Sequence, residues 1–252
     1  MNALHRVRPA SGWVLPQRPW NGRTVLDAFC CQGGAAMGYW LAGYDVLGVD
    51  ISDQPRYPFA FVLGDAVEFI AAHGHRFDLA HASCPCQGYS ETQRLRGNTH
   101  PKLISDTRAA LQSTGRPWVM ENVPGAPLVD PLTLCGAMFG LRTYRHRLFE
   151  TSPGLDLTTP PHPAHTAPVA KMGRPVAEGE FMHVVGNFSG VDLARRVMQM
   201  PWANRDGLRE AIPPAYTQWI GHHAAAHLTA SSPGQQRPVS RSPVRVGGGD
   251  DR

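Results

Sequence analysis

The chain has 252 residues, long enough to bury one substantial core, and its 42% hydrophobic and 17% charged residues are typical of a globular protein. No apolar run approaches the roughly 20 residues needed to cross a bilayer, and the amino-terminal stretch lacks the apolar segment of a secretory signal. The formal charge of +4 suits a polyanionic partner without requiring one. The five cysteines show no disulfide spacing, so we expect reduced thiols and a cytoplasmic location.

The first half of the chain alternates predicted strands with predicted helices. The expected strands cover residues 24–29, 45–50, 60–63, 77–82 and 117–123, and the expected helices cover 35–42, 66–73 and 103–115. Such alternation is typical of a parallel, doubly wound sheet with helices on both faces. The sequence therefore predicts an α/β, Rossmann-like fold.

The second half is less regular. Residues 132–139 and 143–150 are predicted strands, and Arg145 and Arg147 would share one face of the latter. Residues 151–183 are rich in proline, threonine and histidine, which predicts a loop-dominated insert. The last expected elements are helices at 193–200 and 205–211, a helix opened by the prolines at 213–214, and a disordered tail beyond 228.

A cysteine follows the fourth predicted strand, in the sequence Pro85-Cys86-Gln87. Open α/β sheets bind ligands at the carboxyl ends of their strands, so this position suits a nucleophilic thiolate. A buried thiol beside a turn is the simpler alternative, because free cysteines are commonly buried. Cys84 and Cys86 as a redox pair is a minor reading, since they are separated by one residue instead of two.

Other polar motifs also stand at predicted strand ends. Gly33 and Gly34 follow the first strand, and Asp50 ends the second, about 20 residues past these glycines, where dinucleotide-binding folds place a ribose-binding carboxylate. Asp65 follows the third strand, and Glu121 lies at the end of the fifth. Because parallel strands end at one edge of the sheet, we expect these groups to share a site.

Together these motifs resemble those of the DNA cytosine-5 methyltransferases. The motifs found in that family's order and spacing are Asp27 to Gly34, Asp50, Gly64-Asp65, Pro85-Cys86-Gln87, Glu121-Asn122-Val123 and Arg145-x-Arg147. The chain resembles a compact, phage-type member, and the match runs from about Arg23 to about Gly221. The resemblance implies a Rossmann-like S-adenosylmethionine-dependent methyltransferase sheet with a small, loop-rich target-recognition insert.

The resemblance implies a covalent mechanism on a cytosine that is flipped out of duplex DNA. Cys86 would add as a thiolate to carbon 6, which activates carbon 5 for methylation. Glu121 would hold a proton at ring nitrogen 3, and Asn122 would fix the geometry around Glu121. Arg147 would contact the base oxygen, with Arg145 beside it steadying the active-site loop.

The resemblance also implies a site for S-adenosylmethionine. The glycine pair would let the backbone approach its methionyl part, Asp50 would accept hydrogen bonds from the ribose, and Asp65 would meet the adenine amino group. The residues expected to bind the cofactor are Phe29, Gly33, Gly34, Asp50, Ile51, Asp65, Ala66 and Pro85.

Five segments follow from this reading. They are an amino-terminal leader (1–22), a catalytic domain (23–150), a reduced target-recognition insert (151–190), helices that complete the catalytic domain (191–228) and a disordered tail (229–252). We expect a monomer that acts on double-stranded DNA in the cytoplasm of a bacterial or phage-infected cell. The recognition sequence and any cognate restriction nuclease cannot be read from the chain. An RNA or free cytosine nucleotide substrate, and a non-catalytic nucleic-acid-binding relative, stay open as alternatives.

Three positions depart from the family pattern. Cys31 stands where a third glycine is usual, Thr143 where glutamine is usual, and Glu210 replaces an asparagine in the segment that closes the cofactor pocket. No metal site is predicted. His223 and His227 are four apart on an expected helix, but no third ligand is in register with them.

Overall fold

The structure is a computed structural model that describes residues 7–8, 12–85 and 103–230. Its centre is an eight-stranded sheet in the order β1-β4-β3-β2-β5-β6-β8-β7. The strands are β1 (Val7–Arg8), β2 (Thr24–Ala28), β3 (Asp45–Asp50), β4 (Ala60–Leu63), β5 (Leu79–Ser83), β6 (Trp118–Asn122), β7 (Leu132–Leu134) and β8 (Arg147–Thr151). The helices are α1 (Gly34–Leu41), α2 (Ala66–His73), α4 (Ile104–Ser113), α5 (Val191–Val197), α6 (Arg205–Glu210) and α7 (Pro214–Ala230), with short 3-10 helices η1 (Gly74–Arg76) and η2 (Gly136–Phe139).

The sheet is parallel at its centre and antiparallel toward its edges. Strands β4, β3, β2, β5 and β6 are parallel neighbours. Strand β8 runs antiparallel to both β6 and β7, and β1 runs antiparallel to β4. The chain order reverses between β2 and β5, which makes this the topological switch point, the place where open α/β sheets bind ligands. The predicted α/β, doubly wound, Rossmann-like fold is confirmed, and the expectation of a wholly parallel sheet is wrong at its edges.

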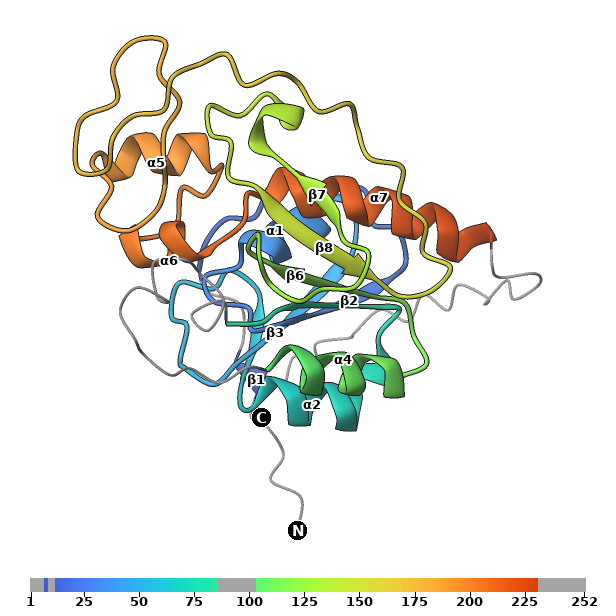
Figure 1. Ribbon diagram of the computed structural model, residues 1–252. Coiled ribbons are helices and arrows are strands. Elements are labelled where there is room, and N and C mark those ends of the chain that lie inside the picture. Colours follow the sequence, from blue (N-terminus) through green and yellow to red (C-terminus); the bar gives the residue numbers. More distant parts are fainter. Residues whose placement is uncertain (1–6, 9–11, 86–102, 231–252) are drawn as a thin grey trace, which may run out of the picture.

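Helices cover both faces of the sheet. Figure 1 shows α2 and α4 together on one face and α1 with α7 on the other. Each face of the sheet carries its own hydrophobic core, and successive residues of β2 point into opposite cores. Val25 packs on the side of α1 and α7, and Leu26 packs on the side of α2 and α4. This alternation is the two-residue period of a strand that is buried on both faces. It explains why the central strands have near-continuous apolar sequences.

The predicted strands at 132–139 and 143–150 are shorter than expected. Strand β7 ends at Leu134, and the chain then turns into η2. A side chain at Gly136 would collide with the backbone of Thr143, so the two segments approach closely here. Strand β8 begins only at Arg147, because Arg145 has a left-handed backbone (φ 27) that breaks the extended run. Strand β1 was missed because two residues carry no periodicity.

The segment between β8 and α5 is dominated by loops. It runs over the same side of the sheet as α7 (Figure 1), and its regular pairing is limited to one bridge between Val169 and Phe181. Buried apolar side chains, among them Leu155, Met182 and Phe188, anchor it to the core beneath. The proposed boundaries of the five segments stay a prediction. The expected disordered tail (229–252) is wrong for residues 229 and 230, which belong to helix α7, and the rest of it lies outside the described residues.

Within the described ranges, no helix combines the length and the apolar character that a membrane crossing requires.

Helix α7 approaches α1 closely enough to require glycine. A Cβ atom at Gly38 would collide with the carbonyl oxygen of Pro214 and the hydroxyl of Thr217. The Thr217 hydroxyl donates a hydrogen bond to the carbonyl of Ala35 (2.8 Å). This contact brings the start of α7, and the segment before it, onto the amino-terminal end of α1. The carboxyl-terminal helices therefore form part of the same fold as the central sheet.

We predict that Gly38→Ala lowers the free energy of unfolding by about 1–3 kcal/mol, because the atoms it meets are largely backbone and cannot rotate away. Gly12→Ala is the matched control, since a Cβ there meets nothing within 4 Å, and it should change stability by less than about 0.5 kcal/mol. Urea denaturation of both variants measures the difference. Equal stability of the two would show that α1 and α7 are not in close contact.

Candidate active site

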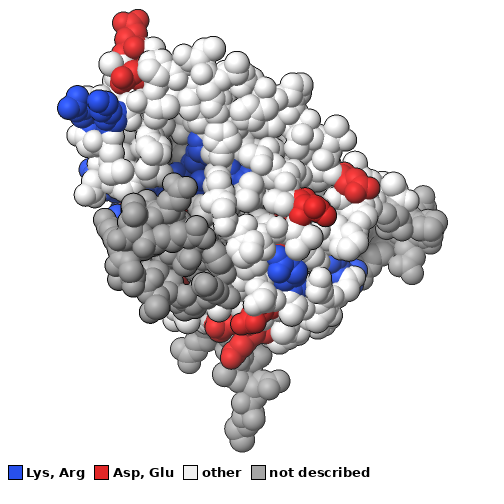
Figure 2. Space-filling view, in the orientation of Figure 1, with Lys and Arg blue, Asp and Glu red and all other residues white. Residues whose placement is uncertain are grey.

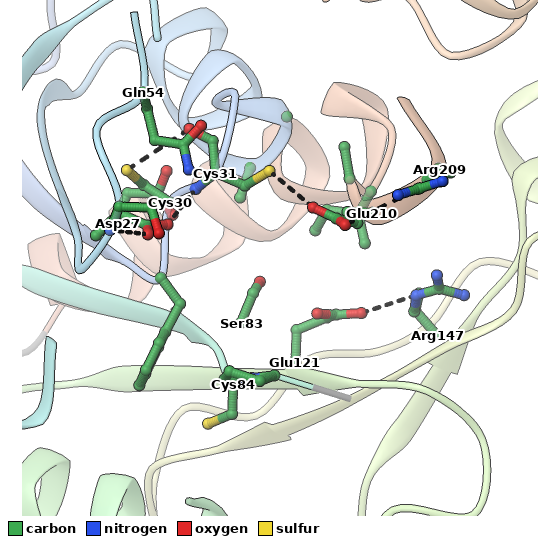
Figure 3. Close-up of a pocket in the computed structure, with 18 of the residues that line it drawn as sticks. Asp27, Cys30, Cys31, Gln54, Ser83, Cys84, Glu121, Arg147, Arg209 and Glu210 are labelled. Carbon is green, nitrogen blue, oxygen red and sulfur yellow. Dashed lines mark hydrogen bonds and ion pairs between the residues drawn. The ribbon is translucent and has the colours of Figure 1, made fainter. Parts of the chain in front are cut away.

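A cavity of about 370 Å³ opens at the carboxyl-terminal ends of β2, β3, β5 and β6. Its lining includes groups from the β2–α1 loop, from the ends of β5 and β6, and from the segment between α6 and α7 (Figure 3). The sequence predicted that polar strand ends would meet at one edge of the sheet. The structure brings Asp50, Pro85, Glu121 and Arg147 into this one cavity.

Asp27 is a buried carboxylate in the cavity lining, with only 1% of its surface exposed. The Tyr57 hydroxyl donates to its Oδ2 atom (3.2 Å), whereas Oδ1 makes no hydrogen bond to the described part of the chain. Burial raises the pKa of Asp27 well above its ordinary value, and the bond from Tyr57 and a weaker contribution from the backbone of Ala36 oppose this. A buried acid with an unpaired oxygen suits a cationic ligand.

The β2–α1 loop has a strained backbone. Phe29, Cys31 and Gly33 have φ values of 57, 45 and 81, all in the left-handed region. A side chain at position 31 therefore costs on the order of 1–2 kcal/mol relative to glycine. The Cys31 N–H donates to Asp50 Oδ2 (3.0 Å), and the Ser52 N–H donates to Asp50 Oδ1 (2.9 Å). Asp50 therefore holds two loops of the cavity in place.

The predicted cofactor residues divide into two groups. Phe29, Gly34, Asp50, Ile51 and Pro85 line the cavity, and the Ile51 side chain is 73% exposed, which leaves an apolar surface available to a ligand.

Gly33, Asp65 and Ala66 do not line the cavity. Gly33 caps α1, Asp65 caps α2 by accepting a hydrogen bond from the Glu68 N–H (2.9 Å), and Ala66 lies in the core. Their roles toward a cofactor stay predictions.

Two of the departures from the family pattern meet in the cavity. The Cys31 thiol donates to Glu210 Oε2 (3.5 Å). Burial, and then the charge of Glu210, raise the pKa of Cys31 to about 12, so this thiol stays protonated at neutral pH. Cys31 and Glu210 are thus a hydrogen-bond donor and its acceptor within the cavity.

Glu121 and Arg147 form a buried ion pair, with Arg147 Nε 3.0 Å from Glu121 Oε1. Their encounter follows from strand register. Glu121 pairs with Phe149, and Arg147 lies two residues before Phe149 on the same face of β8, so the two side chains are diagonal neighbours. Burial raises the pKa of Glu121 above its ordinary value, and the charge of Arg147 is the largest opposing effect.

A buried chain of hydrogen bonds reaches Glu121 from the sheet. The Tyr39 hydroxyl lies 3.0 Å from His81 Nδ1, and His81 Nε2 lies 3.0 Å from Ser83 Oγ. Ser83 in turn hydrogen-bonds Glu121. Burial lowers the pKa of His81 to about 3, so its ring is neutral and offers one donor and one acceptor. These residues fix the position of Glu121, and sequence reasoning missed them because only their burial gives them significance.

Asn122 fixes the chain just before the proposed nucleophile. Its Nδ2 donates to the carbonyl of Cys84 (3.2 Å), and its Oδ1 accepts from the Val123 N–H (2.9 Å). Burial raises the pKa of Cys84 to about 11, and Figure 3 shows its thiol turned away from Glu121. Cys84 is therefore poorly placed to act as a nucleophile. Cys86 lies outside the described residues.

Arg145 does not share a strand face with Arg147, and that expectation is wrong. Its guanidinium is buried and donates to the carbonyls of Val184 (2.5 Å), Arg209 (2.7 Å) and Ala211 (2.7 Å). The left-handed backbone at Arg145 turns its side chain toward the insert and the segment that closes the cavity. Arg145 thus steadies loops around the site from outside the cavity.

Charged groups are scattered over the face that carries the insert. Figure 2 shows small groups of both signs there, with one group of basic side chains recessed at the centre. Arg94, Arg96 and Lys102, basic residues whose charge would suit contacts to DNA phosphates, lie outside the described residues.

No family model and no curated protein matches the chain. Solved structures with some likeness to it include several methyltransferases. A SAM-dependent methyltransferase from Agrobacterium tumefaciens shares 17% identity at a TM-score of 0.30, covering 43% of this chain and 41% of its own. The magnesium protoporphyrin IX methyltransferase of Synechocystis, with bound SAM, shares 17% identity at 0.34, covering 53% and 70%. The 1,6-didemethyltoxoflavin-N1-methyltransferase of Burkholderia thailandensis shares 15% identity at 0.33, also covering 53% and 70%.

These scores are too low to support an argument about function. The sheet order and the cavity themselves define the class: a Rossmann-like α/β protein with a ligand pocket at the topological switch point.

The raised pKa of Glu121 predicts a pH-dependent stability. Its folded pKa lies above its unfolded value, so its contribution is complete below the ordinary pKa of about 4.3 and is lost as the pH rises through the folded pKa. Relative to Glu121→Gln, the wild type should therefore become less stable as the pH rises above about 4. Urea midpoints of the wild type and of Glu121→Gln, measured across this pH range, give the difference in stability. If the stability of the wild type relative to Glu121→Gln did not fall as the pH rose, the raised pKa of Glu121 would be contradicted.

Proposed function

We propose that this chain is an S-adenosylmethionine-dependent enzyme that methylates carbon 5 of cytosine in DNA, with Cys86 as the nucleophile. The observation that carries the proposal is the buried Glu121–Arg147 pair, which opens into the same cavity as Asp50 and Ile51. In this one cavity, Glu121 could contact the ring of the cytosine, and Asp50 and Ile51 could contact the nucleoside part of the cofactor. Pro85 lines it, and Cys86 is the next residue in the chain.

The cofactor half of the cavity fits the chemistry of S-adenosylmethionine, which supplies the methyl group when bound. This molecule carries a sulfonium and an ammonium cation, and the unpaired oxygen of Asp27 would gain a partner from such a charge. Each oxygen of Asp50 accepts one hydrogen bond from a backbone N–H, and it keeps a lone pair for a ribose hydroxyl. The exposed Ile51 side chain offers apolar contact to adenine.

The reaction needs a thiolate and a proton held near the base. Cys86 would form a carbon–sulfur bond at carbon 6 of the cytosine while Glu121 holds a proton at ring nitrogen 3, so that carbon 5 becomes nucleophilic and takes the methyl group. Loss of the carbon 5 proton to a base then expels the thiolate and restores the ring. Burial of Glu121 favours its protonated form, which suits this role.

Arg147 limits that effect and orients the carboxyl group. Its charge opposes the rise that burial causes in the pKa of Glu121, and the ion pair fixes the position of the carboxyl group. Arg147 also borders the cavity, where a base oxygen would find a donor. Ser83, at the end of β5, hydrogen-bonds Glu121, and Asn122, at the end of β6, hydrogen-bonds the carbonyl of Cys84.

DNA is the proposed partner because the mechanism requires a single exposed base and because the chain is basic overall. The insert offers few long basic side chains for reading base edges, Lys171 and Arg174 among them, so we expect a short recognition sequence. We expect a monomer, since one chain carries every proposed catalytic group.

We predict that a duplex containing 5-fluorocytosine traps the wild type covalently when S-adenosylmethionine is present, since fluorine cannot leave as a proton does. Cys86→Ser should lose both the adduct and methylation, because an alcohol is scarcely ionised at neutral pH. Cys84→Ser is the matched control and should keep the adduct. Denaturing gel electrophoresis reads the result. An adduct lost in Cys84→Ser and kept in Cys86→Ser would overturn the assignment.

A second pair of variants separates chemistry from cofactor binding. Glu121→Gln should lower kcat by about 10²–10⁴-fold with little change in cofactor Kd. Asp50→Asn should weaken cofactor binding by about tenfold, through one weakened hydrogen bond to the ribose. Calorimetry and single-turnover assays measure the two effects, with unfolding curves to verify the fold. Reduced cofactor affinity with unchanged turnover in Glu121→Gln would show that the two roles are misassigned.

A further inference from the structure

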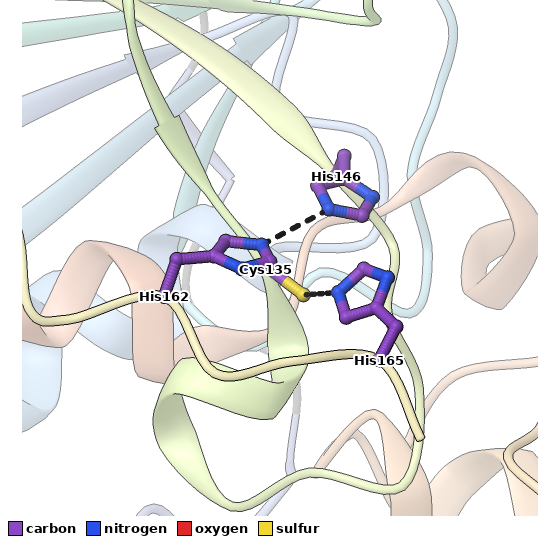
Figure 4. A group of neighbouring side chains, drawn as sticks. All are labelled: Cys135, His146, His162 and His165. Carbon is purple, nitrogen blue, oxygen red and sulfur yellow. Dashed lines mark hydrogen bonds between the residues drawn. The ribbon is translucent and has the colours of Figure 1, made fainter. Parts of the chain in front are cut away.

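A second group of chemically active side chains lies outside the cavity. Cys135, at the turn between β7 and η2, meets His146, just before β8, and His162 and His165 from the insert (Figure 4). No two of their ligand atoms are more than 4.8 Å apart. Cys135 Sγ lies 3.4 Å from His165 Nε2, and His146 Nε2 lies 3.2 Å from His162 Nε2.

We propose that these four residues form a structural zinc site. With metal–nitrogen bonds of about 2.0–2.1 Å and a metal–sulfur bond of about 2.3 Å, the edges of a tetrahedral site are about 3.3 Å between nitrogens and about 3.6 Å between nitrogen and sulfur. The observed separations of 3.2 Å and 3.4 Å lie close to these edges. Two of the six edges thus already match a tetrahedral site, and the other ligand atoms, all within 4.8 Å of one another, would move inward to close on an ion.

The type of ligand selects the metal. Three imidazoles and one thiol, with no carboxylate, suit zinc and disfavour magnesium or calcium, which require oxygen. On binding, the Cys135 thiol releases its proton to solvent and coordinates as a thiolate, and the imidazoles coordinate as neutral rings. Four protein ligands leave no open position, so the site would be structural and not catalytic.

The alternative is that hydrogen bonds alone hold the group together. A hydrogen bond between the His146 and His162 rings and another between the Cys135 thiol and His165 would account for the two close pairs. They do not require that all four ligand atoms converge on one point. Tyr144 adds to the preorganisation, because its ring stacks on His165 (centroids 3.6 Å apart) and its hydroxyl bonds both the N–H and the carbonyl of Ala167.

The ion would connect the insert to the active site. His146 precedes Arg147, and the Arg147 guanidinium donates to the His146 carbonyl (2.8 Å) while also pairing with Glu121. Zinc at His146 would therefore fix the segment that positions Arg147. The insert, which has almost no regular pairing of its own, would gain two of its anchors from His162 and His165.

The sequence prediction of no metal site overlooked this group. Its ligands are separated by 11 or more residues except for the short His162-x-x-His165 pattern, so no compact motif marked them. His223 and His227, the pair that the sequence analysis considered for a metal, lie elsewhere on α7. His223 Nδ1 bonds the Trp219 carbonyl (2.9 Å), and neither His223 nor His227 belongs to a possible metal group among the described residues.

The test is the zinc content of the purified full chain by inductively coupled plasma mass spectrometry, after dialysis against a slight excess of zinc and then against metal-free buffer. We expect about one equivalent in the wild type and less than about a tenth of that in His162→Ala and Cys135→Ser. His162 is exposed on a loop, so its variant should keep the fold by circular dichroism. His223→Ala is the matched control and should bind zinc like the wild type.

Cobalt provides a second measurement on the wild type itself. Cobalt(II) in this site should show the intense visible bands of tetrahedral coordination and a thiolate charge-transfer band that Cys135→Ser lacks. Removal of the ion by a chelator should lower the Tm of the wild type and leave that of His162→Ala unchanged. Equal zinc in wild type and His162→Ala, or octahedral cobalt spectra, would overturn the proposal. None of these readouts depends on methyl transfer, so the site can fail independently of the proposed function.

Discussion

The carboxyl group of Glu121 is buried at the end of β6, and the surrounding structure has to stabilise it there. Removing Glu121 from water is costly unless it is protonated or paired, and Arg147 provides the pair at 3.0 Å. Arg147 lies on β8, which runs antiparallel between β6 and β7. Because of this direction, the start of β8 lies beside the end of β6, where Glu121 is. His81 and Ser83 complete the support from the neighbouring strand. The result is an acid with a raised pKa that faces a cavity instead of solvent.

The rest of the cavity depends on close packing far from the acid in sequence. Glycines in α1 admit the start of α7, and this contact positions the preceding segment, including Glu210, over the β2–α1 loop. Arg145 joins the same segment to the insert through three backbone carbonyls. The segments that close the site are thus fixed by a few polar contacts to the sheet and to the insert.

Local pattern predicted local structure well. The bounds of β3, β4 and α2 follow directly from periodicity and from the capping residue Asp65, and the meeting of strand ends follows from the parallel sheet. What failed depends on tertiary register. The left-handed turn at Arg145, the antiparallel direction of β8 and the convergence of Cys135 with three histidines have no short-range signal. The two departures at Cys31 and Glu210 were visible in sequence, but only the structure shows that they contact each other.

The central claim is that the acid and the cofactor pocket serve methyl transfer to carbon 5 of cytosine. The most direct measurement is to incubate the purified chain with duplex DNA and S-adenosylmethionine labelled in its methyl group, digest the DNA to nucleosides and identify the labelled product by mass spectrometry against standards. We predict label in 5-methyldeoxycytidine alone, and none when RNA or free cytosine nucleotides replace the duplex. Label on an exocyclic nitrogen, on RNA in place of DNA, or on no nucleoside at all would contradict the claim.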